Sequence, residues 1–305
     1  MELNELESVA RYEEFDSIKR LDKGWSGEEK YVISCNGREK YLLRVADISM
    51  YEVKKEQYEL LKKVDKLNIN TSRPIDFGVL NENKVYTLLT WLEGEDAEEA
   101  VSKVSDKEAY NLGYKAGEML RKLHSIPVDL TNEKTWIEKY KLKLERKYKA
   151  MYESPIEVPN KELLREYMDS HLYLLENRPQ GFSHGDYHVG NMIVNNNDIG
   201  IIDFEKNKYS DPYDEFKQFI WNVRANEYFE TGMINGYFEN NIPDDFFPIL
   251  KIYAVEQLIS FLPWCFKFGE EDVKKGYKLN DDIMKSYDNL KIDIPTWYKG
   301  ILKFD

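Results

Sequence analysis

The segment GFSHGDYHVGNMIVNNNDIGIIDFE (Gly181–Glu205) concentrates the side chains of this sequence that are best suited to chemistry. His184, Asp186 and His188 alternate along the chain, so an extended backbone would place all three on one side. One interpretation is therefore a metallohydrolase cluster, since histidine and carboxylate both bind zinc. The chain has only 4 histidines, which is few for a two-metal hydrolase. A polar loop without chemistry is a second interpretation.

A third interpretation is a phosphoryl-transfer site. This chemistry requires an acceptor for the proton of the attacking hydroxyl and oxygen ligands for Mg²⁺ beside the nucleotide phosphates. Asp186, then Asn191, then Asp203 supply these groups in a suitable order. The intervening MIVNNNDIGIID predicts a hairpin that folds Asp203 back toward Asn191.

The composition limits the class of protein. The 305 residues are 42% hydrophobic and 32% charged, which is typical of a globular protein, and the net charge of −13 argues against nucleic acid or an anionic membrane as a partner. No apolar run approaches the roughly 18–20 residues of a membrane span, and the acidic N-terminus does not resemble a signal peptide. Cys35 and Cys265 lie far apart, so we expect a cytoplasmic protein without a disulfide framework.

The elements that must position these residues change in kind near residue 94. Two β-rich runs flank Asn36-Gly37 and predict a hairpin over Lys30–Ala46, and a charged helix follows. We expect five strands and one helix before residue 95, and mainly helices afterwards. The sequence therefore predicts an α+β protein with a small β-rich lobe over residues 1–93 and a larger helical lobe over residues 94–305.

The paired motif resembles the aminoglycoside phosphotransferase family. The matching residues are HGDYHVGN at 184–191 and IIDFE at 201–205, where the family has HGDxHxxN and then two hydrophobic residues, an aspartate, an aromatic residue and Asp, Glu or Gly. That family is the small-molecule branch of the protein-kinase-like fold and includes choline and homoserine kinases. The resemblance covers nearly the whole chain. It implies a bilobal fold with a nucleotide-binding N-lobe and a catalytic C-lobe, and a phosphotransferase with an alcohol group as acceptor.

The resemblance also implies roles for individual residues. Asp186 would accept or orient the proton of the acceptor hydroxyl, and Asn191 and Asp203 would bind Mg²⁺. Arg44 would hold the α- and β-phosphates at a position where many relatives have lysine. Glu56 on the following helix would pair with Arg44.

The nucleotide, ATP or GTP, would be covered by the loop KGWSGEE, where backbone amides near Gly24, Ser26 and Gly27 approach the phosphates. The adenine edge would meet the carbonyl of Thr90 and the amide of Leu92. Backbone recognition of this kind does not separate ATP from GTP. No Walker-type motif occurs in the sequence.

The acceptor is less constrained. The leading hypothesis is a hydroxyl of an aminoglycoside or a similar antibiotic, which would make the chain an antibiotic-resistance enzyme. Such a cationic substrate is bound by carboxylates. The candidates are Glu205, Asp214, Glu270 and Glu271.

Two alternatives remain. One is a kinase for choline, an amino-alcohol or a sugar metabolite, with an aromatic cage for a quaternary ammonium. The aromatic candidates are Trp221, Tyr228, Trp264, Phe266 and Trp297. The other is a nucleotide-binding module without turnover, against which the intact set of Asp186, Asn191 and Asp203 argues. We expect a monomer or a weak dimer.

Overall fold

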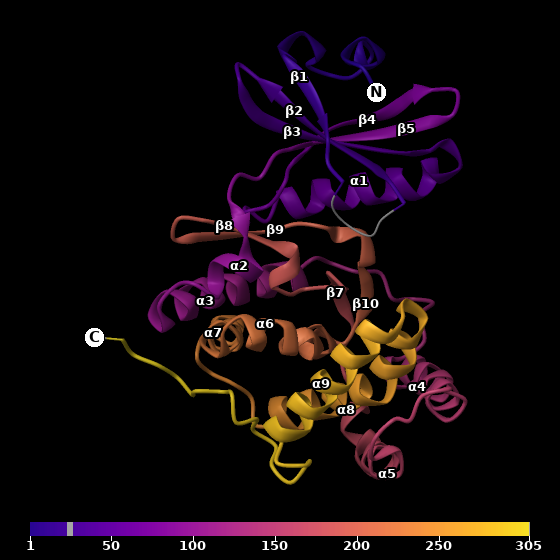
Figure 1. Cartoon of the computed structure of the whole chain (residues 1–305), viewed down its shortest axis with the longest axis vertical. Coiled ribbons are helices and arrows are strands. Elements are labelled where there is room, and N and C mark those ends of the chain that lie inside the picture. The colour runs from indigo at the N-terminus through magenta and orange to yellow at the C-terminus, as the bar shows by residue number, and fades with distance from the viewer. Residues whose placement is uncertain (23–26, 305) are drawn as a thin grey trace. The chain divides into compact units, whose positions relative to one another are not determined.

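The computed structural model describes residues 1–22 and 27–304 of the chain, which forms two compact units (Figure 1). The first comprises Met1–Ala97 and Asn191–Glu205, and the second comprises Glu98–Gly190 and Lys206–Asp305. The predicted lobes, residues 1–93 and 94–305, differ from these units in two respects, and the first is that the first unit extends to Ala97. The second is that residues 191–205 belong to the first unit, because their strands pair with other strands of that unit.

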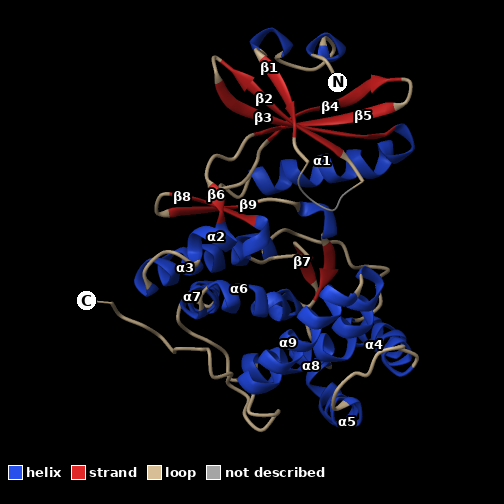
Figure 2. Ribbon diagram, in the orientation of Figure 1, coloured by secondary structure: helices blue, strands red, loops and turns tan. Residues whose placement is uncertain are grey.

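The first unit is built on a five-stranded antiparallel sheet in the order β1-β2-β3-β5-β4 (Figure 2). Its strands are β1 (Ser17–Arg20), β2 (Glu29–Cys35), β3 (Arg38–Asp47), β4 (Pro74–Asn81) and β5 (Lys84–Thr90). Helix α1 (Tyr51–Asp65) packs against β4 and β5. The predicted hairpin joins β2 to β3, and its turn residues Asn36 and Gly37 have φ values of 52° and 71°.

The two faces of strand β3 have different surroundings. Tyr41, Leu43 and Val45 point into the hydrophobic core of the unit, which the N-terminal segment from Leu3 also packs against. The intervening residues Leu42 and Arg44 line a cavity on the opposite face. The alternation follows from the period of two of a β-strand, so an arginine between apolar residues is directed away from the core.

A three-stranded sheet completes the first unit, in the order β6-β8-β9. Its strands are β6 (Glu95–Asp96), β8 (Met192–Asn195) and β9 (Asp198–Ile201). The predicted second hairpin is present, and the Ile202 N–H donates to the Asn191 carbonyl at 3.0 Å. This bond closes the hairpin immediately before Asp203.

The second unit is mainly helical (Figure 2). Its helices are α2 (Ala97–Val101, beginning at the last residue of the first unit), α3 (Asp106–His124), α4 (Trp136–Tyr152), α5 (Lys161–His171), α6 (Phe219–Ala225), α7 (Glu227–Tyr237), α8 (Phe246–Cys265) and α9 (Glu270–Ser286). Strands β7 (Gly181–Ser183) and β10 (Lys208–Ser210) form a short antiparallel ladder. The predicted α+β class is confirmed.

Helix α8 contacts α4, α5 and α9. With the following 3-10 turn η8 (Phe266–Phe268) it is, among the described residues, the one helix long and apolar enough to cross a membrane by length and composition. Of the most apolar 18-residue stretch of this helix, 67% is buried inside the structure. This extent of burial is typical of a core helix, and it explains why α8 has apolar residues on all sides.

Helices α3 and α7 approach each other through glycines. A Cβ atom at Gly113 would lie 1.9 Å from the Phe229 carbonyl oxygen, and one at Gly117 would lie 2.0 Å from the Met233 carbonyl oxygen. Gly232 and Gly236 of α7 face the carbonyls of α3 in the same way. Two G-x-x-x-G pairs therefore set the distance between these helices.

The first prediction concerns this crossing. We expect Gly117→Ala to lower the free energy of unfolding by about 1–3 kcal/mol, the usual cost of overpacking, because the two backbones must move apart. The matched control is Gly276→Ala in α9, where the nearest atoms are the Leu262 Cδ2 at 3.0 Å and the Cys265 Sγ at 3.2 Å, both on side chains. Urea unfolding measures the free energy of unfolding of both variants. Equal values for Gly117→Ala and Gly276→Ala would contradict the proposed packing constraint.

Candidate active site

Asp186 lies in a tight loop between β7 and the 3-10 turn η5 (Val189–Asn191). The preceding Gly185 has a φ of 87°, and a Cβ atom there would lie 1.9 Å from the carbonyl oxygen of Lys206. Only glycine suits this position, which explains the glycine of the HGD motif. His184 is buried, and its Nδ1 accepts the Asp186 N–H at 3.3 Å.

Three hydrogen bonds fix the loop to the rest of the second unit. The Gly185 N–H donates to Glu215 at 2.8 Å, the Val189 N–H donates to the Asn222 Oδ1 at 2.8 Å, and the Tyr187 hydroxyl donates to the carbonyl of Ala116 on α3 at 2.6 Å. Glu215 and Asn222 are buried, so each bond is shielded from water. The loop is thereby held at its centre and on both sides of Asp186.

The carboxylate of Asp186 contacts three side chains. Lys206 lies 2.8 Å from Oδ2, and the His188 Nε2 and the Gln218 amide lie 3.5 Å and 3.3 Å from Oδ1. Burial acts to raise the pKa of Asp186, but hydrogen bonds from His188 and Lys206 outweigh it and hold the pKa below the ordinary range. The group is therefore ionised at neutral pH, as a hydroxyl-orienting carboxylate requires, and it is a weak base.

In the first unit, a cavity of about 60 Å³ contains several of the predicted nucleotide-site residues. It is lined by Leu42, Arg44, Gln57, Leu61, Thr71, Ser72, Leu89 and the run from Ile202 to Glu205. Apolar side chains cover one part of the cavity, and Arg44, Asp203 and Glu205 supply charge. Leu89 directly precedes Thr90, which together with Leu92 is expected to meet the nucleotide base. The role of both residues remains a prediction.

The partners of Arg44 differ from those expected. Its Nε and Nη2 lie 2.6 Å from the Glu28 Oε2, and it also contacts Glu205. Lys54 of α1 contacts Glu28 and lies 3.6 Å from Glu205, so two cations and two carboxylates form one network. Burial acts to raise the pKa of Glu28, but Arg44 and Lys54 outweigh it and lower this pKa.

The expected ion pair between Glu56 and Arg44 is wrong. Glu56 is exposed, whereas Lys54, Gln57 and Leu61 occupy the face of α1 that is turned to the network and the cavity. The positions i, i+3 and i+7 share one face of a helix, and Glu56 does not belong to that set. The acidic partner of Arg44 therefore comes from the residues before β2 and after β9.

The predicted metal ligands Asn191 and Asp203 belong to the first unit. Asp203 lines the cavity, and its φ of 68° is uncommon for a residue with a side chain. No group of three His, Cys, Asp or Glu side chains able to hold a metal occurs in residues 1–22 and 27–304. One carboxylate and one amide nevertheless suit Mg²⁺, which typically takes one or two carboxylates and completes its shell with phosphates and water.

The predicted nucleotide-covering loop is described only in part. Gly24 and Ser26 lie outside the described residues. Gly27 is exposed, and a Cβ atom there would meet nothing within 4 Å. Glu28, the next residue, is the member of this loop that reaches Arg44.

The carboxylates predicted to bind a cationic acceptor are distributed differently from expectation. Asp214 is fully buried and lies 2.8 Å from Lys208 and 2.7 Å from Lys217, so its prediction as a substrate ligand is wrong. Glu205 is engaged by Arg44 and Lys54. Glu270 and Glu271 are exposed in the first turn of α9, and their role remains a prediction.

Lysines surround these buried acids. Besides Lys208 and Lys217, Lys143 and Lys147 of α4 pair with Glu256 of α8. Burial lowers the pKa of Lys217 to about 8, although Asp214 acts in the opposite direction. The surroundings of Asp214 and Glu256 are thus richer in cations than in carboxylates.

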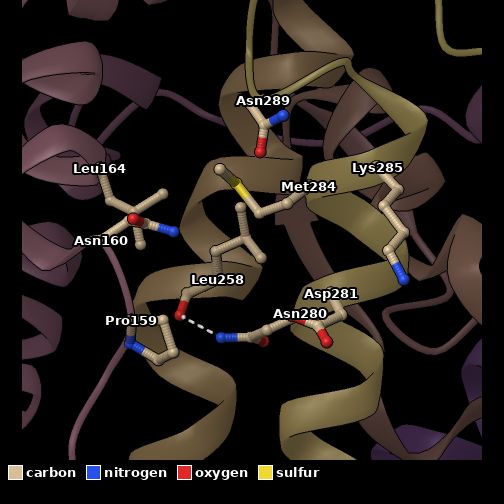
Figure 3. Close-up of a pocket in the computed structure, with 9 residues that line it drawn as sticks. All are labelled: Pro159, Asn160, Leu164, Leu258, Asn280, Asp281, Met284, Lys285 and Asn289. Atoms are coloured by element: carbon tan, nitrogen blue, oxygen red, sulfur yellow. Dashed lines mark hydrogen bonds between the residues drawn. The ribbon is translucent and has the colours of Figure 1, made fainter.

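The second unit also contains a cavity of about 150 Å³ between α5, α8 and α9 (Figure 3). Its lining is polar and apolar in nearly equal parts and consists of Pro159, Asn160, Leu164, Leu258, Asn280, Asp281, Met284, Lys285 and Asn289. None of these residues contacts Asp186 in a recorded interaction, and Asn280 donates to the Leu258 carbonyl at 3.3 Å (Figure 3). We therefore do not assign it to the reaction.

Residues 17–238 match the family model described as the phosphotransferase enzyme family. Among solved structures, the GDP complex of wild-type aminoglycoside 2'-phosphotransferase-IIIa is similar at 17% identity and a TM-score of 0.68, over 92% of this chain and 96% of that one. The gentamicin complex of APH(2")-IIa is similar at 18% identity and a TM-score of 0.59, over 91% and 94%.

A third similar structure is amicoumacin kinase hAmiN in complex with AMP-PNP, Ca²⁺ and Ami, at 13% identity and a TM-score of 0.60, over 91% of this chain and 90% of that one. No curated protein matches the sequence significantly. The solved structures support the bilobal kinase-like fold that the motif implied.

Sequence reasoning missed several residues around the site. Three of them are the charged residues Lys54, Glu28 and Lys206. Charged residues are common on any protein surface, so their charge alone did not mark them as part of the site. Asn222 and Glu230 support the reactive loop from outside the motif: Asn222 donates to Glu230 at 2.7 Å while it receives the Val189 N–H. Nothing in their local sequence indicates that they are buried.

The second prediction concerns Glu230, a fully buried glutamate. Burial raises its pKa to about 8, and the bond from Asn222 lowers it only in part. The unfolded group titrates near 4.5, so between pH 4.5 and about 8 the folded state retains a proton that the unfolded state has lost. Stability therefore falls as the pH rises through this window.

We expect Glu230→Gln, which remains neutral, to gain about 1.4 kcal/mol of stability relative to the wild type for each pH unit across that window. Chemical unfolding at a series of pH values measures the difference. Glu145→Gln on the exposed face of α4 is the matched control for the loss of one carboxylate. Parallel curves for the wild type and Glu230→Gln would show that Glu230 is ionised in the folded protein.

Proposed function

We propose, since the chain belongs to the phosphotransferase enzyme family, that it transfers the γ-phosphoryl group of ATP or GTP to a hydroxyl group of a small molecule. The observation that carries the proposal is the lining of the 60 Å³ cavity, where Arg44 and Asp203 lie beside apolar side chains such as Leu42 and Leu89. A nucleotide requires this combination of an apolar surface for its base with charged groups for its phosphates and metal.

Asp186 would orient the acceptor hydroxyl and accept its proton late in the reaction. A loose phosphoryl-transfer transition state demands little from a base, so a carboxylate with a low pKa is adequate. The rate acceleration comes instead from holding the carboxylate in the correct position relative to the acceptor hydroxyl. The hydrogen bonds from Gly185 and Val189 hold the loop, and Gln218 and His188 orient the carboxylate.

Arg44 and Lys54 would bind the nucleotide phosphates. Both are paired with Glu28 and Glu205 in this structure, so phosphate oxygens must replace at least one carboxylate. Arginine offers two parallel N–H groups to a phosphate, whereas the lysine ammonium adds charge without a fixed geometry.

Asn191 and Asp203 would hold Mg²⁺. When bound, this ion neutralises the charge of the phosphates and positions them for in-line attack. The two residues fit such a role because they provide oxygen donors at the same end of one hairpin, opposite its turn.

The class of molecule that accepts the phosphoryl group is a separate part of the proposal. An antibiotic with a free hydroxyl is supported by the family resemblance, and the gentamicin and amicoumacin kinase complexes show antibiotics bound to structurally similar proteins. A polycationic aminoglycoside has less support from the site itself, because Asp214 is buried and Glu205 is paired. We keep a hydroxylated metabolite as the second candidate. The cytoplasmic location and the state as a monomer or a weak dimer remain predictions.

The third prediction tests the reaction itself. Wild-type protein with Mg²⁺ and ATP or GTP should convert nucleotide in the presence of an acceptor from a panel of aminoglycosides, other hydroxylated antibiotics, choline and amino-sugars. Asp186→Asn keeps the size of the side chain and removes the charge, so we expect turnover to fall roughly 10²–10⁴-fold with nucleotide affinity unchanged. A coupled assay and direct nucleotide titration measure the two quantities. Absence of nucleotide binding by the wild type would refute the kinase proposal.

The fourth prediction concerns the charge network at Arg44. Glu28→Gln removes a carboxylate that competes with phosphate, so nucleotide should bind about fivefold more tightly, which corresponds to about 1 kcal/mol. Arg44→Ala should weaken binding at least about tenfold through loss of charge-assisted hydrogen bonds. Glu29→Gln is the matched control, since Glu29 pairs with Lys84 and not with Arg44. Calorimetry gives the affinities, and equal affinity for Glu28→Gln and Glu29→Gln would mean that Glu28 does not compete.

A further inference from the structure

Lys206 forms an ion pair with Asp186, the carboxylate that we propose for the reaction. The Lys206 Nζ lies 2.8 Å from the Asp186 Oδ2, and both residues belong to the second unit. The backbone of Lys206 packs directly against the same loop, since a Cβ atom at Gly185 would lie 1.9 Å from the Lys206 carbonyl oxygen. Both the main chain and the side chain of Lys206 therefore place it beside the reactive carboxylate.

The Lys206 ammonium group has hydrogen-bonding capacity left. Its side chain is 69% exposed, whereas that of Asp186 is 16% exposed. An ammonium group carries three N–H donors. In the part of the chain that the structure describes, Asp186 is the one residue that Lys206 contacts through its ammonium group. The remaining donors are therefore available to a ligand from solvent.

The exposed side of the Asp186 carboxylate is the side of Lys206. The other oxygen, Oδ1, has the Gln218 amide at 3.3 Å and the His188 Nε2 at 3.5 Å. Gln218 is half-buried, and the His188 side chain is 20% exposed. A hydroxyl group that reaches this carboxylate from solvent therefore meets Oδ2 and Lys206 first.

Other carboxylates of the second unit do not take part in this arrangement. Glu215 and Asp214 are buried, and each is engaged by other groups. Glu270 and Glu271 are exposed at the start of α9, and within the described ranges no ion pair or hydrogen bond joins them to Asp186. A cationic acceptor would therefore meet, at the point of reaction, a carboxylate that already has a cationic partner.

The distance from Lys206 to the reacting oxygen is short. An O–H···O bond to a carboxylate is about 2.5–2.7 Å long. Because Nζ lies 2.8 Å from Oδ2, an acceptor oxygen bonded to Oδ2 lies at most about 5.5 Å from Nζ. A group on the carbon atom next to the hydroxyl is thus close enough to receive an N–H donor of Lys206.

We propose that the Asp186–Lys206 pair recognises an acceptor in which a carboxylate or phosphate group lies next to the hydroxyl that is phosphorylated. The inference rests on the proposed phosphotransfer to a hydroxyl. The acceptor hydroxyl donates to Asp186, and the neighbouring anionic group accepts from Lys206. Each member of the ion pair then has a partner of matching chemistry.

An amino-alcohol presents the opposite combination. Its hydroxyl and its ammonium group both require the Asp186 carboxylate, and the ammonium lies close to the like charge of Lys206. Juxtaposed like charges disfavour a ligand. The pair therefore discriminates against choline and against an aminoglycoside hydroxyl that is flanked by an amine.

A matched set of three-carbon diols, which differ in the group at one end, tests the pair directly. The probes are D-glycerate, sn-glycerol 3-phosphate, glycerol and 3-amino-1,2-propanediol, and ligand-observed NMR titration of the full chain without nucleotide gives their affinities. We expect at least one anionic probe to bind about fivefold more tightly than glycerol, and the amine to bind most weakly. Comparison of D-glycerate with glycerol 3-phosphate shows which of the two anionic groups is preferred.

Lys206→Gln removes the charge and keeps an amide donor at an exposed position. We expect the anionic probes to lose about fivefold in affinity, while the affinity for glycerol is unchanged. Lys141→Gln on the exposed face of α4 is the matched control for the loss of one positive charge. Against the effect of burial, His188 and Lys206 also lower the pKa of Asp186. Loss of that effect would act on all probes alike, so a change of preference among them reports recognition of the anionic group.

Turnover provides a second readout with Mg²⁺ and ATP or GTP. The hydroxyl next to the anionic group should form the new bond to the γ-phosphorus, while the bond to the β-phosphate oxygen breaks and the hydroxyl proton passes to Asp186. Lys206→Gln should raise KM for the anionic probe, whereas kcat should change less. A purely structural role of Lys206 would change both constants for every probe.

Three results would overturn the inference: glycerol or the amine binding as tightly as both anionic probes, no binding of any probe, or equal weakening of all probes by Lys206→Gln. Failure of the phosphotransfer proposal looks different. Nucleotide would then not bind or would not be converted, while the preference for an anionic probe would persist.

Discussion

The arrangement of the site depends on the buried partners of the loop that carries Asp186. A loop with a glycine at positive φ has no helix or strand to satisfy its backbone, so its N–H groups must find side-chain acceptors inside the protein. Glu215 and Asn222 are these acceptors, and Asn222 is in turn held by Glu230 on α7. Helix α7 can supply Glu230 because its glycines let it lie directly against α3. Packing of two helices thus determines where a reactive carboxylate is placed.

The same second unit keeps one partly buried carboxylate charged and one fully buried carboxylate neutral. Asp186 has Lys206 and His188 beside it, and these contacts overcome the effect of burial on its pKa. Glu230 has only the amide of Asn222, so burial prevails and its pKa rises to about 8. A buried acid without a cationic partner is stable only when protonated. The difference separates a group that can orient a hydroxyl from one that serves as a neutral hydrogen-bonding support.

Much of the fold and of the reactive motif could be predicted from local sequence. The Asn36-Gly37 turn and the alternation in β3 depend on neighbouring residues alone, and so does the direction of Arg44 away from the core. The partner of Arg44 could not be predicted in the same way. The sequence contains several glutamates that could pair with Arg44 and does not distinguish among them. The pairing with Glu28 and not with Glu56 depends on how α1 is rotated about its axis. Likewise Asp214 has the composition of a surface acid, and its burial among Lys208 and Lys217 follows only from tertiary packing.

Reaction type and acceptor choice therefore rest on different parts of the chain. The residues that we propose for phosphoryl transfer, Asp186, Asn191 and Asp203, lie in one short stretch of the chain. Of the carboxylates predicted to bind the acceptor, Asp214, Glu270 and Glu271 lie outside that stretch. A sequence can therefore keep Asp186, Asn191 and Asp203 while the residues that meet the acceptor change. Membership of the family consequently says more about the bond that is formed than about the molecule that receives it.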